Sequence, residues 1–350
     1  MLVYQKLGEA EEVERWLREL WQGGIFTASP PRKRFAGAYT LYCSIVQYKE
    51  MDYILKRYNP LGVDGIQAEK ANYLLFGEHA MFPRLEAFLP KGTETLKSMS
   101  YGVLISYYSQ EVSPSGISLA EVLAIGLAMA TMFTYFVEKC RIYFDLRSDS
   151  LRLDSAGGLH LIDFSDLITT EDLLSRSYAG LPVVDRKSKF IPPEGTSYQG
   201  IYEDSLGDKA PWSAVRKAAH LINPERYQVF SLAGLITELL VGFVPGDTAL
   251  SARIDGADQV NDGSFTASER NQLLDLLIRM QDPNDTNRPA LKEVRELSWS
   301  LLSSRLTYEG ITSNRASMRA AKLLQTIPRR EDDSTSLAIH QSLEPYWSTL

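Results

Sequence analysis

The sequence predicts an α+β fold in which a group of strands precedes a group of long helices. Residues 24–28, 39–48 and 52–58 are short segments rich in β-branched and aromatic side chains, and they follow one another along the chain. Residues 118–139 and 227–242 are longer and largely apolar, as buried helices are. Strands in one part of a chain and helices in another are typical of folds in which helices and sheet are segregated.

Other elements complete this arrangement. Residues 8–21 start with acidic side chains and then place apolar ones at helical spacing, which predicts an amphipathic helix. A helix is also expected at 67–76, and a strand that runs into a loop at 101–108. Beyond residue 306 the chain is expected to be a peripheral extension with one helix, at 314–324.

Composition limits the functional classes. The chain has 350 residues, 44% of them hydrophobic, a net charge of −7 and two cysteines. The acidic charge argues against nucleic-acid binding, which needs a basic face. Cys43 and Cys140 suit neither a disulfide framework nor a zinc site, so both are expected to be buried thiols in a reducing, cytoplasmic compartment. The N-terminus lacks the pattern of a signal peptide. The uncharged run 122–137 is shorter than the roughly 20 residues of a membrane span, so it predicts a buried core helix and no membrane span.

A short hairpin flanked by carboxylates is expected in the middle of the chain. Two apolar strands, 150–153 and 159–162, are joined by a turn that contains Ser-Ala-Gly-Gly. Asp145 and Asp149 precede the first strand, and Asp163 follows the second. Because a hairpin brings its outer ends together, we expect these acids to lie close in space. Paired carboxylates can bind Mg²⁺ and accept a proton from a hydroxyl.

These acids stand in a pattern that resembles the protein kinase family. Residues 143–150 (YFDLRSDS) align with the catalytic loop H-R-D-L-x-x-x-N, and residues 163–165 (DFS) align with the metal loop D-F-G. Residues 191–194 (IPPE) are similar to the A-P-E element, and residues 227–242 (YQVFSLAGLITELLVG) are similar to the core helix D-V-W-S-L-G-x-x-x-x-E-L-x-x-G. The elements occur in the family's order.

Two ion pairs are expected from the same resemblance. Residues 53–56 (YILK) are similar to the V-A-I-K strand, so Lys56 is expected on the inward face, paired with Glu69 or, as a fallback, with Glu78. The alternative is a surface lysine on an edge strand. The D-P-x-x-R-P element lies within residues 273–294, and its Arg288 is expected to hold Glu194 in a bidentate contact.

The resemblance covers about residues 24–302 and implies a bilobal fold with a small antiparallel-sheet N-lobe and a larger helical C-lobe. The expected division of the chain is an N-terminal helical extension, the N-lobe, the C-lobe and a C-terminal tail, at residues 1–23, 24–108, 109–305 and 306–350. Residues 195–226 exceed what the family allows before the core helix and are interpreted as an insertion.

The resemblance implies transfer of the γ-phosphate of ATP, with Mg²⁺, to a hydroxyl of a protein substrate, Ser or Thr rather than Tyr. Asp145 would deprotonate the acceptor, and Lys56, supported by Glu69, would hold the phosphates. Asp163 would bind Mg²⁺ and Arg147 would lie near the γ-phosphate. The further nucleotide-binding residues that it implies are Ile105 behind the nucleotide, Ser106 and Tyr108 at the adenine, and Arg32 and Lys33 in the turn over the phosphates.

Several departures from the family pattern leave an alternative open. Ser150 replaces the Asn that binds the second metal, although Asp149 is a possible substitute ligand. The turn at 29–37 contains only one glycine, Gly37, Ser165 replaces the Gly of the metal loop, and Gln228 replaces the Asp that braces the catalytic loop. A pseudokinase that acts as a nucleotide-sensing or partner-binding scaffold is therefore the second hypothesis. A glycoside hydrolase with two carboxylates is a third, although it has no use for Lys56.

Overall fold

The structure is a computed structural model, and it describes the backbone of residues 40–48, 51–58, 63–77, 79–89, 102–106, 108, 110–112, 116–144, 146–164, 167–174, 191–207, 209–241, 254–255, 257–258 and 265–347. Two compact units are present. The first, here called unit 1, comprises Met1–Tyr108, Asp163–Asp166 and Ser177–Val183. The second, unit 2, comprises Ser109–Ile162, Leu167–Arg176 and Val184–Leu350.

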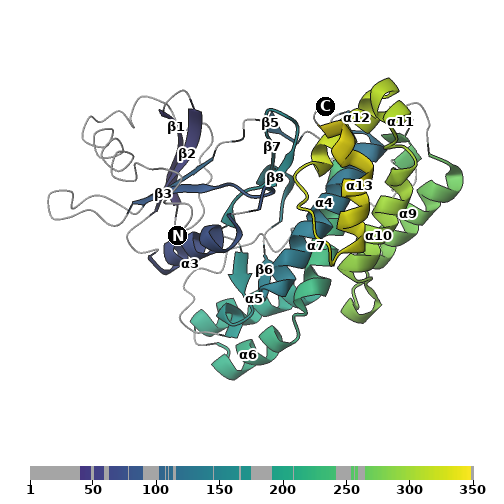
Figure 1. The fold of residues 1–350 in the computed structure, drawn as a ribbon. Helices are drawn as coiled ribbons and strands as arrows, with labels where there is room; N and C mark the ends of the chain where they lie inside the picture. The colour runs from purple at the N-terminus through teal and green to yellow at the C-terminus, as the bar shows by residue number, and fades with distance from the viewer. Residues whose placement is uncertain are drawn as a thin grey trace. The chain divides into compact units, whose positions relative to one another are not determined.

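The described part of unit 1 is an antiparallel sheet with one helix. The strands are β1 (Thr40–Tyr48), β2 (Met51–Tyr58), β3 (Leu85–Leu89) and β4 (Gly102–Ser106), in the order β1-β2-β4-β3 (Figure 1). The strands expected at 39–48, 52–58 and 101–108 are thus confirmed, whereas β3, a five-residue segment, was not predicted. Strand β2 pairs with neighbours on both sides, which places Lys56 between Cys43 and Val103 rather than on an edge.

Helix α3 (Val63–Phe76) packs against β3 and presents one polar and aromatic stripe to the interior of unit 1. Its buried residues are spaced three and four apart, as one face of a helix requires: Glu69, Asn72, Tyr73 and Phe76. Leu74 and Leu75 lie on the opposite face and are 42% and 40% exposed. The helix was predicted from residue 67, and it starts one turn earlier.

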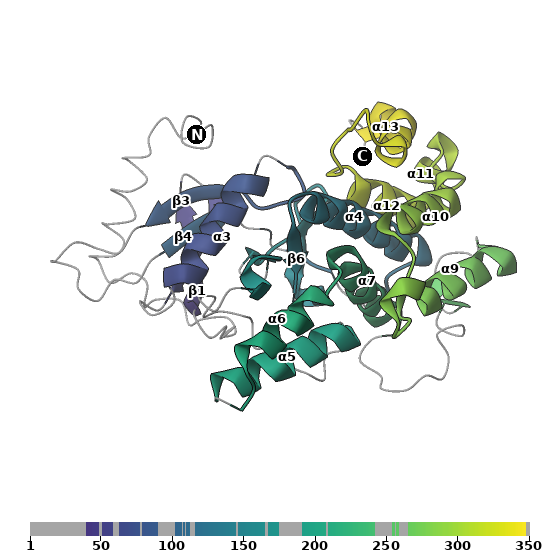
Figure 2. The same ribbon diagram turned by 90° about the horizontal axis from the view of Figure 1, so that it is seen from below.

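Helix α4 (Leu119–Glu138) is the central element of unit 2. It starts at a capping box, in which Ser118 accepts from the amide of Glu121 and the Glu121 carboxylate accepts from the amide of Ser118. Helices α7 (Pro224–Val241), α10 (Leu291–Ser303) and α12 (Arg315–Leu324) surround it (Figure 2). Among the described residues α4 alone is long and apolar enough to cross a membrane, and nearly all of it is buried within unit 2, as expected for a core helix.

Five short strands accompany these helices. Strands β5 (Gln110–Glu111), β7 (Leu151–Leu153) and β8 (Leu159–Leu161) form one antiparallel sheet, and β6 (Arg141–Tyr143) pairs with β9 (Leu167–Thr169). The predicted hairpin is β7–β8, and Leu151 lies opposite Leu161. Its turn is closed by Asp154, which accepts hydrogen bonds from the amides of Ala156 and Gly158.

The segment interpreted as an insertion is helical. It forms most of α5 (Pro193–Leu206) and all of α6 (Trp212–His220), two helices that pack on each other. An aromatic contact joins the two helices: Tyr202 of α5 meets the edge of Trp212 of α6, with ring centroids 5.9 Å apart. Within α5, Tyr198 stacks on Tyr202 at 6.1 Å. Tyr198 is fully buried, so this segment contributes to the core of unit 2.

The tail differs from its prediction in number of helices and in packing. It contains α11 (Tyr308–Ser313), α12 and α13 (Ser334–Trp347), where one helix was expected. Helix α12 packs against the central helix α4 and buries Ala320, Ala321 and Leu324 completely. The expected peripheral extension is therefore wrong, because the tail supplies part of the core. The remaining helix is α9 (Ala267–Met280).

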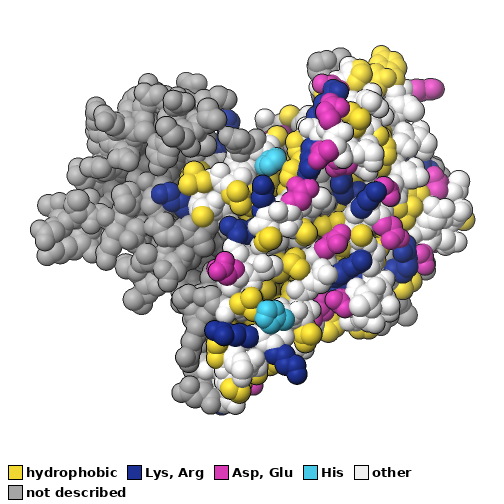
Figure 3. Space-filling view, turned by 60° about the horizontal axis from the view of Figure 1, so that its bottom comes forward, with side chains coloured by type: hydrophobic (Ala, Val, Ile, Leu, Met, Phe, Trp, Pro, Cys, Tyr) yellow, Lys and Arg dark blue, Asp and Glu magenta, His cyan; other side chains and the backbone are white. Residues whose placement is uncertain are grey.

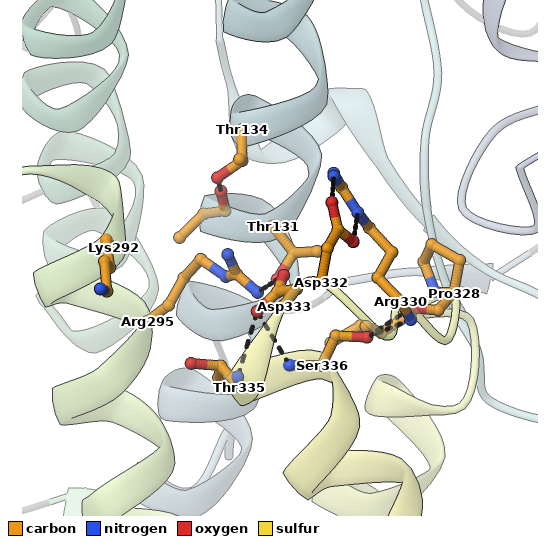
Figure 4. Close-up of polar contacts among 12 residues, drawn as sticks. Thr131, Thr134, Lys292, Arg295, Pro328, Arg330, Asp332, Asp333, Thr335 and Ser336 are labelled. Carbon is orange, nitrogen blue, oxygen red and sulfur yellow. Dashed lines mark hydrogen bonds and ion pairs between the residues drawn. The ribbon is translucent and has the colours of Figure 1, made fainter.

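Polar contacts fix the chain between α12 and α13 (Figure 4). Arg330 reaches both Asp332, at 2.7 Å, and Glu138 at the end of α4, at 2.8 Å. Arg295 of α10 pairs with Asp333, which also accepts from the amides of Thr335 and Ser336 (Figure 4). These contacts attach the charged segment 330–333 to α4 and α10.

The prediction of buried cysteines is wrong for Cys140. This residue follows α4, has a φ of 52° and is exposed. The apolar sequence before it belongs to the buried helix, but the chain leaves the core between Glu138 and Cys140 before it returns in β6. The side chain of Cys43 lies outside the described residues.

Candidate functional site

In unit 1 the ammonium of Lys56, on β2, forms ion pairs with a carboxylate on α3 and with a carboxylate in the segment after β8. Its Nζ atom lies 2.9 Å from Oε1 of Glu69 on α3 and 2.7 Å from Oδ1 of Asp163. Lys56 is 7% exposed and Glu69 is completely buried. The Lys56–Glu69 ion pair expected from the sequence is present, and the fallback partner Glu78 lies outside the described residues.

Among the described residues, two carboxylates lie within ion-pair distance of the Lys56 ammonium, and that of Glu69 has no access to water. Burial raises the pKa of Glu69 above its ordinary value; the positive charge of Lys56 opposes this shift and the negative charge of Asp163 adds to it. A buried carboxylate with a raised pKa beside a specific charge partner is typical of functional sites.

Asp163 is held in an unusual backbone conformation. Its φ is 72°, in the left-handed region that non-glycine residues seldom adopt. The next residue, Phe164, is completely buried and fixed on both its backbone and its ring: the amide of Asn72 donates to its carbonyl at 3.1 Å, and its ring stacks on Tyr73 at 4.8 Å. Phe76 and Phe82 pack against the same ring at 6.1 and 5.2 Å. A local strain of this kind persists where surrounding packing enforces it, often at functional sites.

The fixed backbone leaves the Asp163 carboxylate partly accessible. Its side chain is 35% exposed, whereas that of Lys56 is 9% exposed. No group of three or more His, Cys, Asp or Glu side chains forms a metal-binding cluster in the described part of the chain. Mg²⁺ often binds to one or two carboxylates, with water and phosphate oxygens as the other ligands, so a single accessible carboxylate is compatible with it.

In unit 2 the segment aligned with the catalytic loop is packed on both sides of Asp145, which itself lies outside the described residues. Tyr143 is buried, stacks on Phe136 at 6.3 Å and donates to the carbonyl of Ile162 at 2.7 Å. Phe144 stacks on Tyr227 of α7 at 5.0 Å, and the Tyr227 hydroxyl donates to the Phe144 carbonyl.

The residues after Asp145 form a polar cluster with α7. Nε of Arg147 lies 3.5 Å from Oδ1 of Asp149, and both side chains are about 40% exposed, at 43% and 39%. Burial raises the pKa of Glu238 on α7, and the neighbouring hydroxyl and amide of Ser148 oppose that shift. Ser150, the expected metal ligand, is 4% exposed and starts the hairpin, so its hydroxyl is the least accessible of the proposed ligands.

Gln228, at the position of the Asp that braces the catalytic loop in the family, is completely buried, and neither atom of its amide hydrogen-bonds to any other described residue. Ten residues later on the same helix, Glu238 lies near Ser148, which opposes the rise in its pKa. Glu238 was not predicted from the sequence, although a carboxylate inside the apolar run LITELLVG was a visible signal.

Asn72 was also missed. It lies three residues after Glu69 on α3, so the helix presents both side chains to the interior of unit 1. An amide at that spacing within an aromatic and apolar stripe was the available signal.

His160, in the hairpin of unit 2, is 4% exposed, and its Nε2 lies 2.9 Å from Oδ2 of Asp154 in the hairpin turn.

The predicted closing ion pair of unit 2 is present. Arg288 binds Glu194 with two nitrogens, Nη1 to Oε1 at 2.6 Å and Nη2 to Oε2 at 3.0 Å. Its Nε donates to the carbonyl of Asp282 at 2.8 Å, and further donations go to the carbonyls of Arg226 and Pro283. Arg288 is 2% exposed, so the pair fixes the start of α5 within the core.

The other predicted nucleotide-binding residues are described only in part. Ile105 and Ser106 belong to β4, opposite Ile54 and Tyr53 of β2, but their side chains are not described. Tyr108 is half-buried at the end of unit 1. Three predicted positions lie outside the described residues, namely Arg32, Lys33 and Ser165.

Comparison with known proteins gives one distant similarity. The chain is 28% identical over 161 residues to CBL-interacting protein kinase 8 of Oryza sativa subsp. japonica. The match covers 44% of this chain and 29% of the plant protein, so the chain spans less than a third of that protein's length. No model of a known protein family matches the sequence. The similarity indicates a protein-kinase-like relationship.

Proposed function

We propose that the chain is a divergent protein kinase with a bilobal fold that transfers the γ-phosphate of ATP to a hydroxyl of a protein, Ser or Thr rather than Tyr. The observation that carries the proposal is the position of Lys56, which bonds to a helical carboxylate, Glu69, and to the first residue of the metal loop, Asp163. The similarity to a plant protein kinase supports it independently.

In this proposal Lys56 holds the α- and β-phosphates. Glu69 keeps the lysine charged and fixed, because a buried ammonium without a counter-charge would lose its proton. Asp163 would hold Mg²⁺, which when bound supplies the charge neutralisation that phosphoryl transfer needs. The anchored backbone of Phe164 keeps the Asp163 carboxylate in one place, so that no reorganisation is needed when substrate binds.

The acceptor side of the proposal rests on unit 2. Asp145 would accept the proton of the hydroxyl, and Arg147 would stabilise charge on the γ-phosphate. Asp149 is a better candidate than Ser150 for a second metal contact, since it is the more exposed of the two. The backbone of Ser106 to Tyr108 would bind adenine, Ile105 would lie behind it, and Arg32 and Lys33 would meet the phosphates.

A scaffold without catalysis is the second candidate. The buried hydroxyl of Ser150 and the unbonded amide of Gln228 favour it, because each departs from the arrangement that the family uses for metal binding and loop support. Catalysis is tested by incubating the full chain with labelled Mg-ATP and a Ser/Thr peptide mixture, and by measuring thermal unfolding with and without Mg-ATP.

For an enzyme we expect three results. The chain forms a phosphorylated product, Mg-ATP raises its unfolding temperature, and Asp163→Asn abolishes both effects. Asp145→Ala should lower product formation by at least about 100-fold and retain the thermal shift. Asp275→Asn, at an exposed carboxylate of α9, is the control and should change neither. A thermal shift that Asp163→Asn leaves intact, without any product, would support the scaffold.

A further inference from the structure

Helix α6 has an exposed face that is positively charged. Its buried residues Val215, Ala218 and Ala219 face the core of unit 2. Arg216, Lys217 and His220 are exposed on the other side, at the three- and four-residue spacing that aligns side chains along one face. Figure 3 shows Lys and Arg side chains gathered near a histidine over the helices of this part of unit 2.

This face lacks the acidic partners that most cations of unit 2 have. Arg270, Arg279, Arg305 and Arg330, for example, each bind one or two carboxylates. Neither Arg216 nor Lys217 has a carboxylate within ion-pair distance in the described part of the chain. From residue 209 to residue 224 the sequence contains three Lys or Arg residues and no Asp or Glu, although the whole chain carries a net charge of −7.

The helix alone does not explain this arrangement. Cations near a helix C-terminus interact favourably with the macrodipole, which accounts for Lys217 and His220 in the last turn. Arg216 is not in that turn, so the macrodipole does not account for it. Leu221, next to His220, is 65% exposed and so adds an apolar side chain to a charged face.

We infer that this face of α6 docks an acidic peptide segment of a partner protein. Carboxylates of such a segment would meet the cations of Arg216 and Lys217, the ring of His220 could donate a hydrogen bond, and an apolar side chain would cover Leu221. The platform is rigid, because the Tyr202–Trp212 contact joins α5 to α6 and the Glu194–Arg288 pair fixes the start of α5. Since the chain has a net charge of −7, its overall charge would not attract such a segment, so the local cations of α6 would direct it. The inference concerns binding and does not depend on phosphoryl transfer.

The test uses the full chain and a fluorescent peptide that contains Glu and Leu, with a matched peptide in which every Glu is Gln. Binding is followed by anisotropy at rising salt concentration. We expect the Glu peptide to bind, the Gln peptide to bind poorly, and salt to weaken the complex. The double variant Arg216→Glu with Lys217→Glu should weaken binding at least about tenfold.

The control variant carries Lys139→Glu and Arg315→Glu, which change the net charge equally at two other exposed cations of unit 2. It should bind the Glu peptide as the unmodified chain does. Equal losses in both double variants, or none in either, would overturn the inference. So would binding to vesicles of phosphatidylserine, dependent on Arg216 and Lys217, without binding to the peptide. If the Glu substitutions lower the unfolding temperature, Arg216→Gln with Lys217→Gln provides the same comparison.

Discussion

Two ion clusters among the described residues differ in composition and exposure. In unit 2, Glu194 and Arg288 form a neutral pair, and the remaining donors of the guanidinium bind the carbonyls of Asp282, Arg226 and Pro283. In unit 1, two carboxylates, Glu69 and Asp163, share the ammonium of Lys56. The guanidinium of Arg288 is fully buried with its donors satisfied, whereas the Asp163 carboxylate that binds Lys56 is 35% exposed.

This difference separates a structural contact from a candidate site. A buried pair whose hydrogen bonds are all satisfied fixes the chain and has no capacity for a ligand. A cluster that contains a buried carboxylate of raised pKa and a second, partly exposed carboxylate is of the kind that is concentrated at functional sites. The strained backbone of Asp163 agrees with that interpretation, since the fold maintains it against its own conformational preference.

Breaking the neutral pair should have the largest effect on stability. Arg288→Met removes the guanidinium and leaves the largely buried carboxylate of Glu194, 13% exposed, without a counter-charge, so we expect the free energy of unfolding to fall by about 3–5 kcal/mol. The measurement is urea unfolding of the full chain at neutral pH. Arg279→Met is the matched control: its two ion pairs, with Asp275 and Glu293, are exposed, and the expected loss is about 1 kcal/mol or less. Equal losses in both variants would contradict the comparison.

A smaller effect on stability is expected when pH changes the charge of the cluster formed by Lys56, Glu69 and Asp163. Burial raises the pKa of Glu69 above 4.5, its ordinary value, so the folded protein binds this proton more tightly than the unfolded chain does. The free energy of unfolding therefore falls as pH rises from 4.5 through the raised pKa of Glu69. Above that raised pKa the full destabilisation by Glu69 is present. Glu69→Gln should remove this component, which is measured as a flatter dependence of unfolding free energy on pH.

Glu269 of α9 provides a control of opposite sign. Hydrogen bonds from Arg305 lower the pKa of Glu269 to about 2, so its contribution to stability is present above 4.5 and is lost as pH falls toward 2. Glu269→Gln should therefore flatten the acidic limb of the same curve. If Glu69→Gln instead flattens that limb, the assigned direction of the Glu69 shift is wrong.

The sequence was sufficient for the elements that carry strong local patterns. Lys56 could be placed on the inward face because apolar strand residues flank it, and the 118–139 helix could be placed because its apolar run is long. The Glu194–Arg288 pair was predicted by resemblance to a family, not by any local pattern, since 94 residues separate its members.

What could not be predicted depends on tertiary packing. The left-handed φ of Asp163 follows from the anchoring of Phe164 by Asn72 and three aromatic rings, none of which is near it in sequence. The core role of α12 follows from small side chains, Ala320 and Ala321, that let it approach α4 closely, and a short alanine-rich helix gives a weak pattern by itself. Glu238 lies near Ser148 only because α7 crosses the segment that follows Asp145.

The smallest effect on stability is expected for Asp163→Asn. The Asn oxygen can still accept the hydrogen bond from Lys56, and the substitution removes the like charge that faces Glu69. Asn is also among the few residues that adopt the left-handed conformation readily, so the φ of 72° should be retained. We therefore expect the free energy of unfolding to change by less than about 1 kcal/mol. Asp163→Ala lacks both the acceptor and this backbone preference, and it should cost about 1–2 kcal/mol. A loss in Asp163→Asn as large as that of Arg288→Met would mean that the negative charge of Asp163 supports the fold, and the distinction between the two clusters would fail.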